Sequence, residues 1–265
     1  MAKLFLASAT AWQPTPAEFS DALTHLNKRD SVRCEIEAAH ASTPHPTAEN
    51  KARLLARHLL LRELTYDTRA KHRLRKREVY LPISAYGKPL TASYRNGNYS
   101  VTHVVDWVCC ACSSAAVGVD IVAVHAQDNV LSSLILSKEE RVRAEAIPRK
   151  QWPSLFALTW SLKESVLKAL GLGLSTKLQM CDIRLDRVEL ENIMTVSSTA
   201  HGSIYTAPKH RLMVSLLSNT KQPWVYSSLM LPGDPPHILS VVLWEEVVNG
   251  AIELMFVSPQ TALQS

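Results

Sequence analysis

The sequence predicts an α+β fold built from two α+β halves that join near residue 115. The first half opens on a strand-like segment followed by helical spacing, and its end is strand-like. The second half begins helical, and from Ile183 onward short apolar segments alternate with Pro, Gly and Asn turns. The 265 residues suit one large domain or two modest ones. Hydrophobic residues make up 46% and charged residues 20%, which excludes wholesale disorder and fibrous repeats.

The first half begins with elements of clear spacing. Leu4–Ser8 predicts a strand, ended by the prolines that follow it. Residues 16–26 predict a helix, because Phe19, Leu23 and Leu26 repeat on one face. Ala48–Leu64 predicts a second helix with its leucines inside and its arginines outside.

Turn signals and strands follow that helix. Val79–Pro82 predicts an edge strand, because Pro82 cannot donate to a ladder. Tyr86–Pro89 and Asn96–Gly97 are turn signals. Residues 99–113 and 117–124 are strand-like.

The second half contains the helix with the clearest limits. Ser137–Glu140 is a capping box, in which the serine hydroxyl accepts an early amide and the glutamate reaches back. Ser154–Leu170 predicts a long helix that ends at Gly171 in a C-cap position. No repeat is visible in the sequence, so any symmetry between the halves would be structural only.

Positive charge is concentrated in one segment. Residues 51–77 hold ten Lys or Arg and two acidic residues, a net charge of +8, whereas the rest of the chain has a net charge of −3. Such a field favours nucleic acid, a phosphorylated ligand, an acidic protein or an anionic membrane. A solvated basic helix without a partner fits equally well.

Five cysteines, an odd number in a chain this long, do not form a disulfide framework. Cys109 and Cys112 form a Cys-x-x-Cys, but they lie in an apolar run that predicts a buried strand. We expect a reducing cytosol. We expect no membrane span, because no run of 18 apolar residues occurs.

Several charged residues share one face of the helix that ends at Gly171. Trp160, Glu164 and Lys168 are spaced four residues apart, and Lys163 lies beside them. Taken alone, this pattern is explained better by a surface Glu–Lys pair than by a functional site.

Asp120 lies in the otherwise apolar strand Gly118–Val122. A buried carboxylate needs compensation, so Asp120 either caps a turn or holds a cation. Mg²⁺ takes one or two carboxylates together with waters and substrate phosphates. Asp120 and Glu164 supply that pair if the strand and the helix touch.

Two further signals complete an ordered set. Gly87-Lys-Pro89 combines a rigid turn with a cation, and Thr102-His103 lies at the end of a strand. Followed by Gly-Val-Asp120 and then Trp-Ser-Leu-Lys-Glu-Ser-Val-Leu-Lys168, they resemble the single-chain, pseudodimeric class of 4′-phosphopantetheinyl transferases. The resemblance covers most of residues 1–180 and is weak after about 185.

The resemblance implies two similar α+β lobes related by a pseudo-twofold axis, with the active site at their interface. Residues 1–114 would form the N-terminal lobe, on the phosphate and adenine side of coenzyme A. Residues 115–265 would form the C-terminal lobe with the magnesium and the catalytic helix.

The resemblance also implies an activity. These enzymes move the phosphopantetheine arm of coenzyme A onto a serine of an apo carrier protein and release adenosine 3′,5′-bisphosphate. The carrier would come from a fatty-acid, polyketide or peptide synthetase or from the aminoadipate pathway, and the fused halves favour a monomer. The basic segment would suit an acidic carrier protein.

Roles for individual residues follow from the same resemblance. Asp120 and Glu164 would bind Mg²⁺, and Glu164 would also accept the serine proton. Lys168 would stabilise or protonate the departing phosphate. His103 would contact a phosphate of coenzyme A.

Cofactor contacts are implied for more residues. Lys88, with Gly87 and Pro89, would hold the adenine nucleotide end, and Thr102 would lie beside the phosphates. Lys163 would meet phosphate or carrier. The 3′-phosphate would be held by residues from the basic helix, of which the candidates are Lys51, Arg53 and Arg57.

Two departures from the family pattern leave alternatives open. Val122 stands where many bacterial relatives have a carboxylate, and Thr102-His-Val-Val105 lacks the usual glycine. An inactive scaffold that binds carrier proteins, or a nucleic-acid-binding protein using residues 51–77, therefore remain alternatives. The second lacks interleaved aromatic residues for base stacking, since that segment contains only Tyr66.

Overall fold

The computed structural model describes residues 2–40, 46–65, 75–84, 88–89, 98–125, 134–173, 179–186, 188–196, 199–216, 221–244 and 251–263. Gly87, the turn signal Asn96–Gly97 and the middle of the basic run, residues 66–74, lie outside these ranges.

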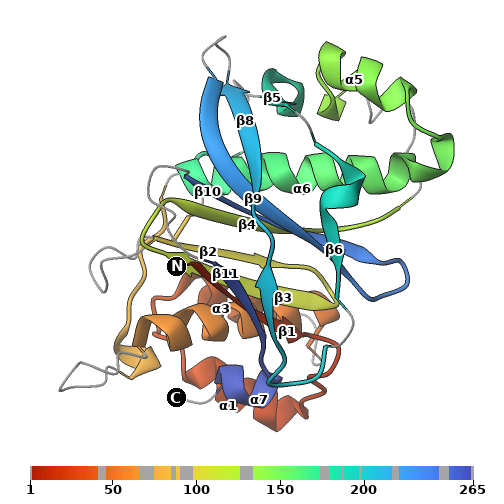
Figure 1. The fold of residues 1–265 in the computed structure, drawn as a ribbon. Helices are drawn as coiled ribbons and strands as arrows, with labels where there is room; N and C mark the ends of the chain where they lie inside the picture. The colour runs from red at the N-terminus through yellow and green to blue at the C-terminus, as the bar shows by residue number, and fades with distance from the viewer. Residues whose placement is uncertain are drawn as a thin grey trace.

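One sheet of five strands forms the lower half of the molecule in Figure 1. Its order is β2-β3-β1-β11-β7. The strands are β1 (Ala2–Ser8), β2 (Asn98–His103), β3 (Trp107–Ser113), β7 (Ile204–Ala207) and β11 (Ile252–Phe256). The strand β11 pairs parallel with β1, so the end of the described chain lies beside its beginning.

A second sheet contains six strands. Its main order is β4-β10-β9-β8-β5, and β6 pairs parallel with β9. The strands are β4 (Val117–Ala123), β5 (Ile183–Asp186), β6 (Ile193–Thr195), β8 (His210–Leu216), β9 (Lys221–Leu231) and β10 (His237–Trp244). Apart from β4, these strands form the β-rich tail that the sequence predicts, together with β7 and β11.

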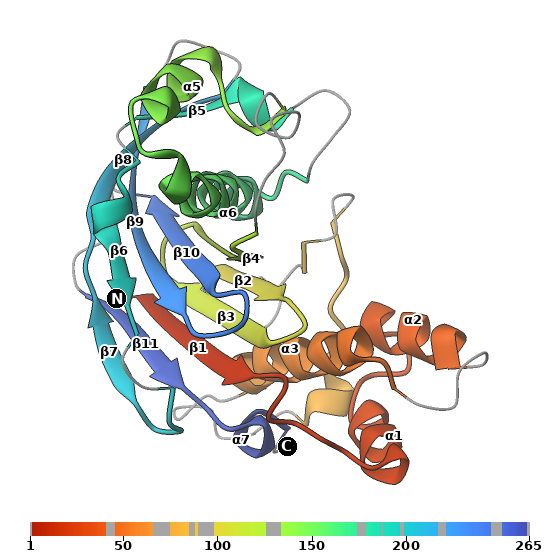
Figure 2. The ribbon, with the colours of Figure 1, turned by 90° about the vertical axis from the view of Figure 1, so that its right-hand side faces the viewer.

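The two long helices, α3 (Ala48–Thr65) and α6 (Trp152–Leu170), cover the outer faces of the two sheets (Figure 2). The other helices are α1 (Pro16–Thr24), α2 (Ser31–His40), α5 (Lys138–Glu145) and α7 (Pro259–Leu263). Short 3₁₀ turns span Lys76–Glu78, Arg149–Gln151, Met180–Asp182 and Leu190–Asn192. The helix α3 lies against the first sheet, and α6 lies against the second.

Alternation along the strands divides the apolar side chains between separate cores. Leu4 and Leu6 of β1 point into the core between the sheets, whereas Phe5 and Ala7 pack with α3. Successive residues of a strand face opposite sides, so a strand buried on both faces is apolar throughout. This explains the continuous apolar run of β1. Cys109 and Cys110 are buried on opposite faces of β3, as the buried-strand prediction requires.

Two expectations for the first half are wrong. Residues 79–82 form no strand, and the only bridge described nearby joins Ile83 to Pro89. The arginines of α3 are not all outside, because Arg57 is 4% exposed and pairs with Asp30. The α+β class is confirmed, whereas the pseudo-twofold relation and the boundary at residue 114 stay predictions. The strands β7 and β11 complete the first sheet although they lie beyond that boundary.

Among the described residues, no helix is both long and apolar enough to cross a membrane.

Candidate active site

The site depends on a close approach between β4 and α6. A Cβ atom added to Gly118 would lie 1.8 Å from the carbonyl oxygen of Ser165, so only glycine fits there. Asp120 lies on β4 two residues after Gly118. The glycine of the Gly-Val-Asp pattern therefore lets the strand and the helix meet, the condition under which Asp120 and Glu164 could act as a pair.

Asp120 is 7% exposed and receives hydrogen bonds from both halves of the chain. Its Oδ1 accepts from Lys168 Nζ of α6 at 2.6 Å and from Thr102 Oγ1 of β2 at 3.1 Å. Next to it, the backbone N–H of Val119 donates to Ser100 Oγ of β2 at 3.1 Å. The carboxylate is thus fixed where β2 and β4, strands of different sheets, lie side by side.

Glu164 lies one turn before Lys168 on the same face of α6, as the spacing predicts. Burial raises the pKa of its carboxyl, the negative charge of Asp120 raises it further, and the Lys168 ammonium opposes both. The two carboxylates therefore lie within each other's electrostatic field. Among the described residues, no hydrogen bond to the Glu164 side chain occurs.

This donor set fits a magnesium ion held mainly by its substrate. Mg²⁺ keeps several waters and is usually bound by one or two carboxylates plus phosphate oxygens. Asp120 and Glu164 are two such carboxylates, and their mutual repulsion is what a cation would relieve. Within the described ranges, no group of three or more His, Cys, Asp or Glu residues could hold a metal. Any ion here would depend on ligand oxygens.

A pocket of about 180 Å³ opens in front of these residues. It is lined by Lys88 and Pro89, by Tyr99–Val101 of β2, and by Glu164, Lys168 and Gly171–Gly173 of the end of α6. Two predicted signals far apart in sequence, the Lys-Pro pair and the charged face of α6, therefore line one pocket.

The Lys88 ammonium, which we expected to contact a nucleotide, is already hydrogen-bonded within the protein. The Lys88 Nζ donates to the carbonyl oxygens of Lys168 at 2.8 Å and Ala169 at 3.0 Å. Burial lowers the pKa of this ammonium group. Lys88 is thus bound to the end of α6.

His103 lies at the end of β2 and is partly exposed. Its Nε2 lies 2.9 Å from Glu49 Oε1, in the first turn of α3. A phosphate contact by His103 would have to form beside this carboxylate.

The cofactor or carrier contact expected of Lys163 is wrong. Lys163 is fully buried, and its Nζ donates to Glu140 Oε2 at 2.6 Å and to the carbonyl oxygens of Ile135 at 2.7 Å and Met180 at 3.0 Å. Two of these partners lie on other elements, Glu140 on α5 and Met180 on a 3₁₀ turn. Glu140 also caps α5. Lys163 therefore joins α5 and the 3₁₀ turn at Met180 to the buried side of α6.

The three basic candidates for the 3′-phosphate differ in availability. Arg57 is an incorrect candidate, because it is buried and its Nε donates to Asp30 Oδ2 at 2.7 Å. Arg53 is ion-paired with Glu35 but partly exposed. Among the described residues, Lys51 Nζ makes one weak bond, 3.4 Å from Gln13 Oε1. Lys51 and Arg53 thus stay candidates.

Sequence reasoning missed two partners of the site. The hydroxyl of Thr102, expected beside phosphate, donates to Asp120, and the carboxylate of Glu49 holds His103. Each bond joins residues far apart in the sequence, and neither residue type nor spacing predicts it.

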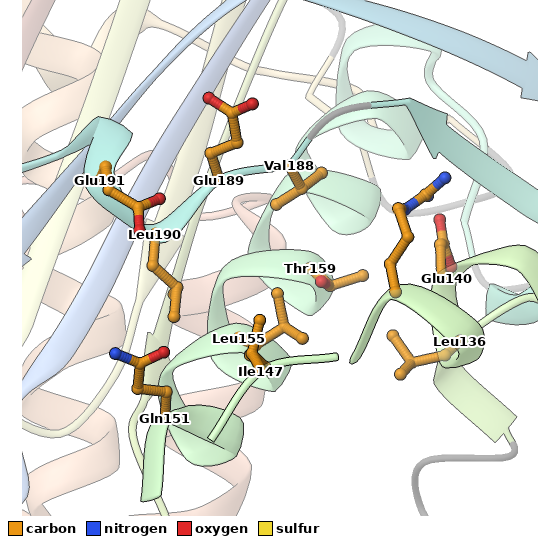
Figure 3. A pocket seen from close by; sticks show the side chains of 11 residues that line it. Leu136, Glu140, Ile147, Gln151, Leu155, Thr159, Val188, Glu189, Leu190 and Glu191 are labelled. Atoms are coloured by element: carbon orange, nitrogen blue, oxygen red, sulfur yellow. The ribbon is translucent and has the colours of Figure 1, made fainter. Parts of the chain in front are cut away.

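A second pocket, of about 170 Å³, lies beside α5 (Figure 3). Its walls include Leu155 and Thr159 of α6 and Val188–Glu191. At 3.6 residues per turn, Leu155 and Thr159 face away from Glu164 and Lys168. None of the predicted site residues lines this pocket.

Comparison with known proteins agrees with the geometry. Residues 116–219 match the model of the 4′-phosphopantetheinyl transferase superfamily, a range that includes Asp120, Glu164 and Lys168. This part of the chain is similar to that superfamily. The resemblance drawn from the motifs is confirmed.

Individual phosphopantetheinyl transferases align over different lengths. The 4′-phosphopantetheinyl transferase Sfp of Bacillus subtilis (strain 168) is 29% identical over 114 residues, which cover 43% of this chain and 51% of that protein. The L-aminoadipate-semialdehyde dehydrogenase-phosphopantetheinyl transferase of Xenopus laevis is 25% identical over 217 residues, covering 75% of this chain and 64% of that protein. The human protein of the same name is 25% identical over 201 residues, covering 69% and 60%. The chain spans about half the length of the bacterial relatives it matches.

Proposed function

We propose that this chain transfers the 4′-phosphopantetheine group of coenzyme A to a serine hydroxyl of an apo carrier protein. The observation that carries the proposal is the meeting of Asp120, Glu164 and Lys168 beside one pocket, on the segment that matches the transferase superfamily. The relatives' names support the same reaction.

The reaction exchanges one phosphorus–oxygen bond for another. The serine oxygen attacks the phosphorus that carries the pantetheine, and the bond from that phosphorus to the bridging pyrophosphate oxygen breaks. Adenosine 3′,5′-bisphosphate leaves with the bond electrons, and Glu164 accepts the serine proton. Such transfers depend on positioning and charge stabilisation more than on covalent help from the enzyme.

Charged groups stabilise the negative charge on the phosphates. Lys168, held at 2.6 Å by Asp120, neutralises the charge that develops on the departing phosphate. Asp120 and Glu164 would hold Mg²⁺, which would supply further neutralisation of the negative charge on the pyrophosphate. Thr102 fixes the Asp120 carboxylate through its hydrogen bond.

Coenzyme A would enter at the pocket beside Lys88 and Pro89. His103 remains the proposed phosphate contact, and Lys51 and Arg53 remain proposed partners of the 3′-phosphate. Because His103 is bonded to Glu49, we propose that phosphate binding rearranges this pair. A monomer in the cytosol, acting on fatty-acid, polyketide, peptide-synthetase or aminoadipate-pathway carriers, completes the proposal.

The test is a mass measurement. The protein is incubated with Mg²⁺, coenzyme A and a panel of apo carriers from these pathways, and each carrier is weighed by mass spectrometry. We expect at least one carrier to gain one phosphopantetheine group. Asp120→Ala and Glu164→Ala should abolish the gain while the protein stays folded, and Lys168→Ala should slow it with coenzyme A binding partly retained. No gain on any carrier, beside a working control transferase, would contradict the proposal.

The nucleic-acid alternative loses support in the described part of the basic segment. Arg57 is ion-paired inside the molecule, Arg53 pairs with Glu35, and Lys76 is 2% exposed. Positive charge that is buried or paired adds little to a surface for a polyanion. No specific observation favours an inactive scaffold either, because Glu164 and Lys168 line the pocket and Asp120 is bonded to Lys168.

A further inference from the structure

The backbone of Lys88, in the segment before β2, is held by two hydrogen bonds to Ser84. The N–H of Ser84 donates to the carbonyl oxygen of Lys88 at 2.8 Å, and the N–H of Lys88 donates to Ser84 Oγ at 3.1 Å. Pro89 forms a bridge with Ile83. These contacts set the direction in which the Lys88 side chain leaves the backbone.

That side chain ends at the C-terminus of the catalytic helix. The last carbonyl groups of a helix lack intrahelical donors and carry partial negative charge, so a cation there is stabilising. The N–H of Gly171, in the left-handed conformation with φ +73°, donates to Lys168 O at 3.2 Å. Lys88 Nζ supplies a second donor to Lys168 O, and it bonds the next carbonyl, that of Ala169.

We infer that Lys88 is a positioning residue that holds the last turn of α6, and with it Lys168, across the seam between the two halves of the chain. The inference rests on the proposed transferase function for its catalytic consequence. It replaces an adenine contact by the Lys88 ammonium with a structural bond to the residue that faces the leaving group.

The hydrogen bonds of the Lys88 ammonium favour the structural role over an adenine contact. Two of the three donors of the ammonium group are directed at main-chain oxygens of α6. Lys168 and Glu164 lie one turn apart on that helix, and Lys168 reaches Asp120. A last turn that frays would therefore move the Lys168 side chain away from Asp120 while leaving the rest of the pocket wall in place.

The test compares Lys88→Met, Lys88→Arg and wild type, with Lys138→Met on the exposed face of α5 as the matched loss of a lysine. The first readout needs no activity. Hydrogen exchange of amides in residues 165–173 should speed up about tenfold in Lys88→Met. It should stay at the wild-type rate in Lys138→Met and return most of the way in Lys88→Arg, whose guanidinium also donates to carbonyls.

The second readout is steady-state transfer. For Lys88→Met, kcat should fall about 10- to 100-fold, with the KM for coenzyme A changed less than about twofold, since a small misplacement of a catalytic group costs rate rather than ground-state binding. A raised KM with unchanged kcat and unchanged exchange would overturn the inference in favour of a nucleotide contact. Unchanged exchange alone would overturn it too.

The two proposals fail separately. If wild type modifies no carrier, the transferase function is wrong, but the exchange experiment still decides whether Lys88 holds the helix end. Should Lys88→Met not fold, Lys88→Gln, which retains a donor of shorter reach, takes its place in both measurements, with a smaller increase in exchange expected and no increase counting against the inference.

Discussion

Glu164 carries its charge at a site where burial and a neighbouring carboxylate both oppose ionisation. Its pKa is raised in the folded protein, so the folded state favours the neutral form and ionisation near pH 7 costs stability. The Lys168 ammonium partly offsets this cost. A residue kept under such conditions is typical of functional sites.

We therefore predict that Glu164→Gln stabilises the protein while it stops transfer. In the presence of a chelator at pH 7, the melting temperature should rise by about 1–4 °C, since a 1 kcal/mol gain moves a chain of this size by a few degrees. Differential scanning calorimetry and the carrier mass assay measure the two effects. A lower melting temperature would mean that the carboxylate is a structural partner instead.

His58 supplies a prediction about pH. It is fully buried, with Nε2 2.9 Å from the carbonyl oxygen of Ala22, and burial together with the nearby Lys76 lowers its pKa to about 3. His25 also lies against the ring. The folded state favours neutral His58, so its contribution is complete above the ordinary histidine value of 6.5 and is lost as the pH falls towards 3.

Stability measured by urea unfolding should thus decline between pH 6.5 and pH 3, with His58 contributing up to about 1.4 kcal/mol per pH unit. His58→Gln, which keeps a donor for Ala22 but cannot titrate, should show a shallower decline. An identical decline in both proteins would assign the acid sensitivity to other groups.

At the scale of elements, the contact between β4 and α6 controls the site. Gly118→Ala places a methyl group 1.8 Å from Ser165 O, which is main chain and can yield only if the whole helix shifts. We predict a loss of about 2–3 kcal/mol of stability, typical of overpacking, together with loss of transfer.

The matched control is Gly202→Ala. Gly202 has φ +85° and open space around the added Cβ, so this change tests backbone strain alone and should cost about 1–2 kcal/mol without affecting transfer. Urea unfolding and the mass assay measure both variants. If Gly118→Ala were as mild as Gly202→Ala and still active, the close approach would not be what brings the site together.

Elements with local signals were predictable from sequence. The capping box at Ser137 and the C-cap at Gly171 are both present, because each depends on residues within a few positions of one another. Lys163 was misassigned for the opposite reason. Its burial depends on Glu140, 23 residues away, and on the carbonyl oxygen of Met180, neither of which helical spacing reveals.

For the whole molecule, strand pairing was beyond the sequence. In β11, Leu254 pairs with Leu4 across 250 residues, and no local pattern specifies this register. The α+β class was predictable because it follows from the spacing within each segment. The pairing of β7 and β11 with the strands of the first sheet was not predictable from the sequence.

This pairing should make the two sheets unfold together. Leu254 is fully buried between them, so Leu254→Ala should cost about 2–5 kcal/mol. Ile204→Ala on neighbouring β7, where the side chain is 64% exposed, should stay within about 0.5 kcal/mol. Tryptophan fluorescence and far-UV circular dichroism should give coincident urea transitions in both variants. Separate transitions would show that the halves fold independently.

The most direct measurement is the catalytic efficiency, kcat/KM, of Asp120→Asn, Glu164→Gln and the double variant on one responsive carrier. If the two carboxylates act as a unit, each single change should lower kcat/KM about 10³-fold, and the double variant should be little worse than either. Losses that multiply in the double variant, or a near-normal rate for either single change, would contradict a joint role for Asp120 and Glu164.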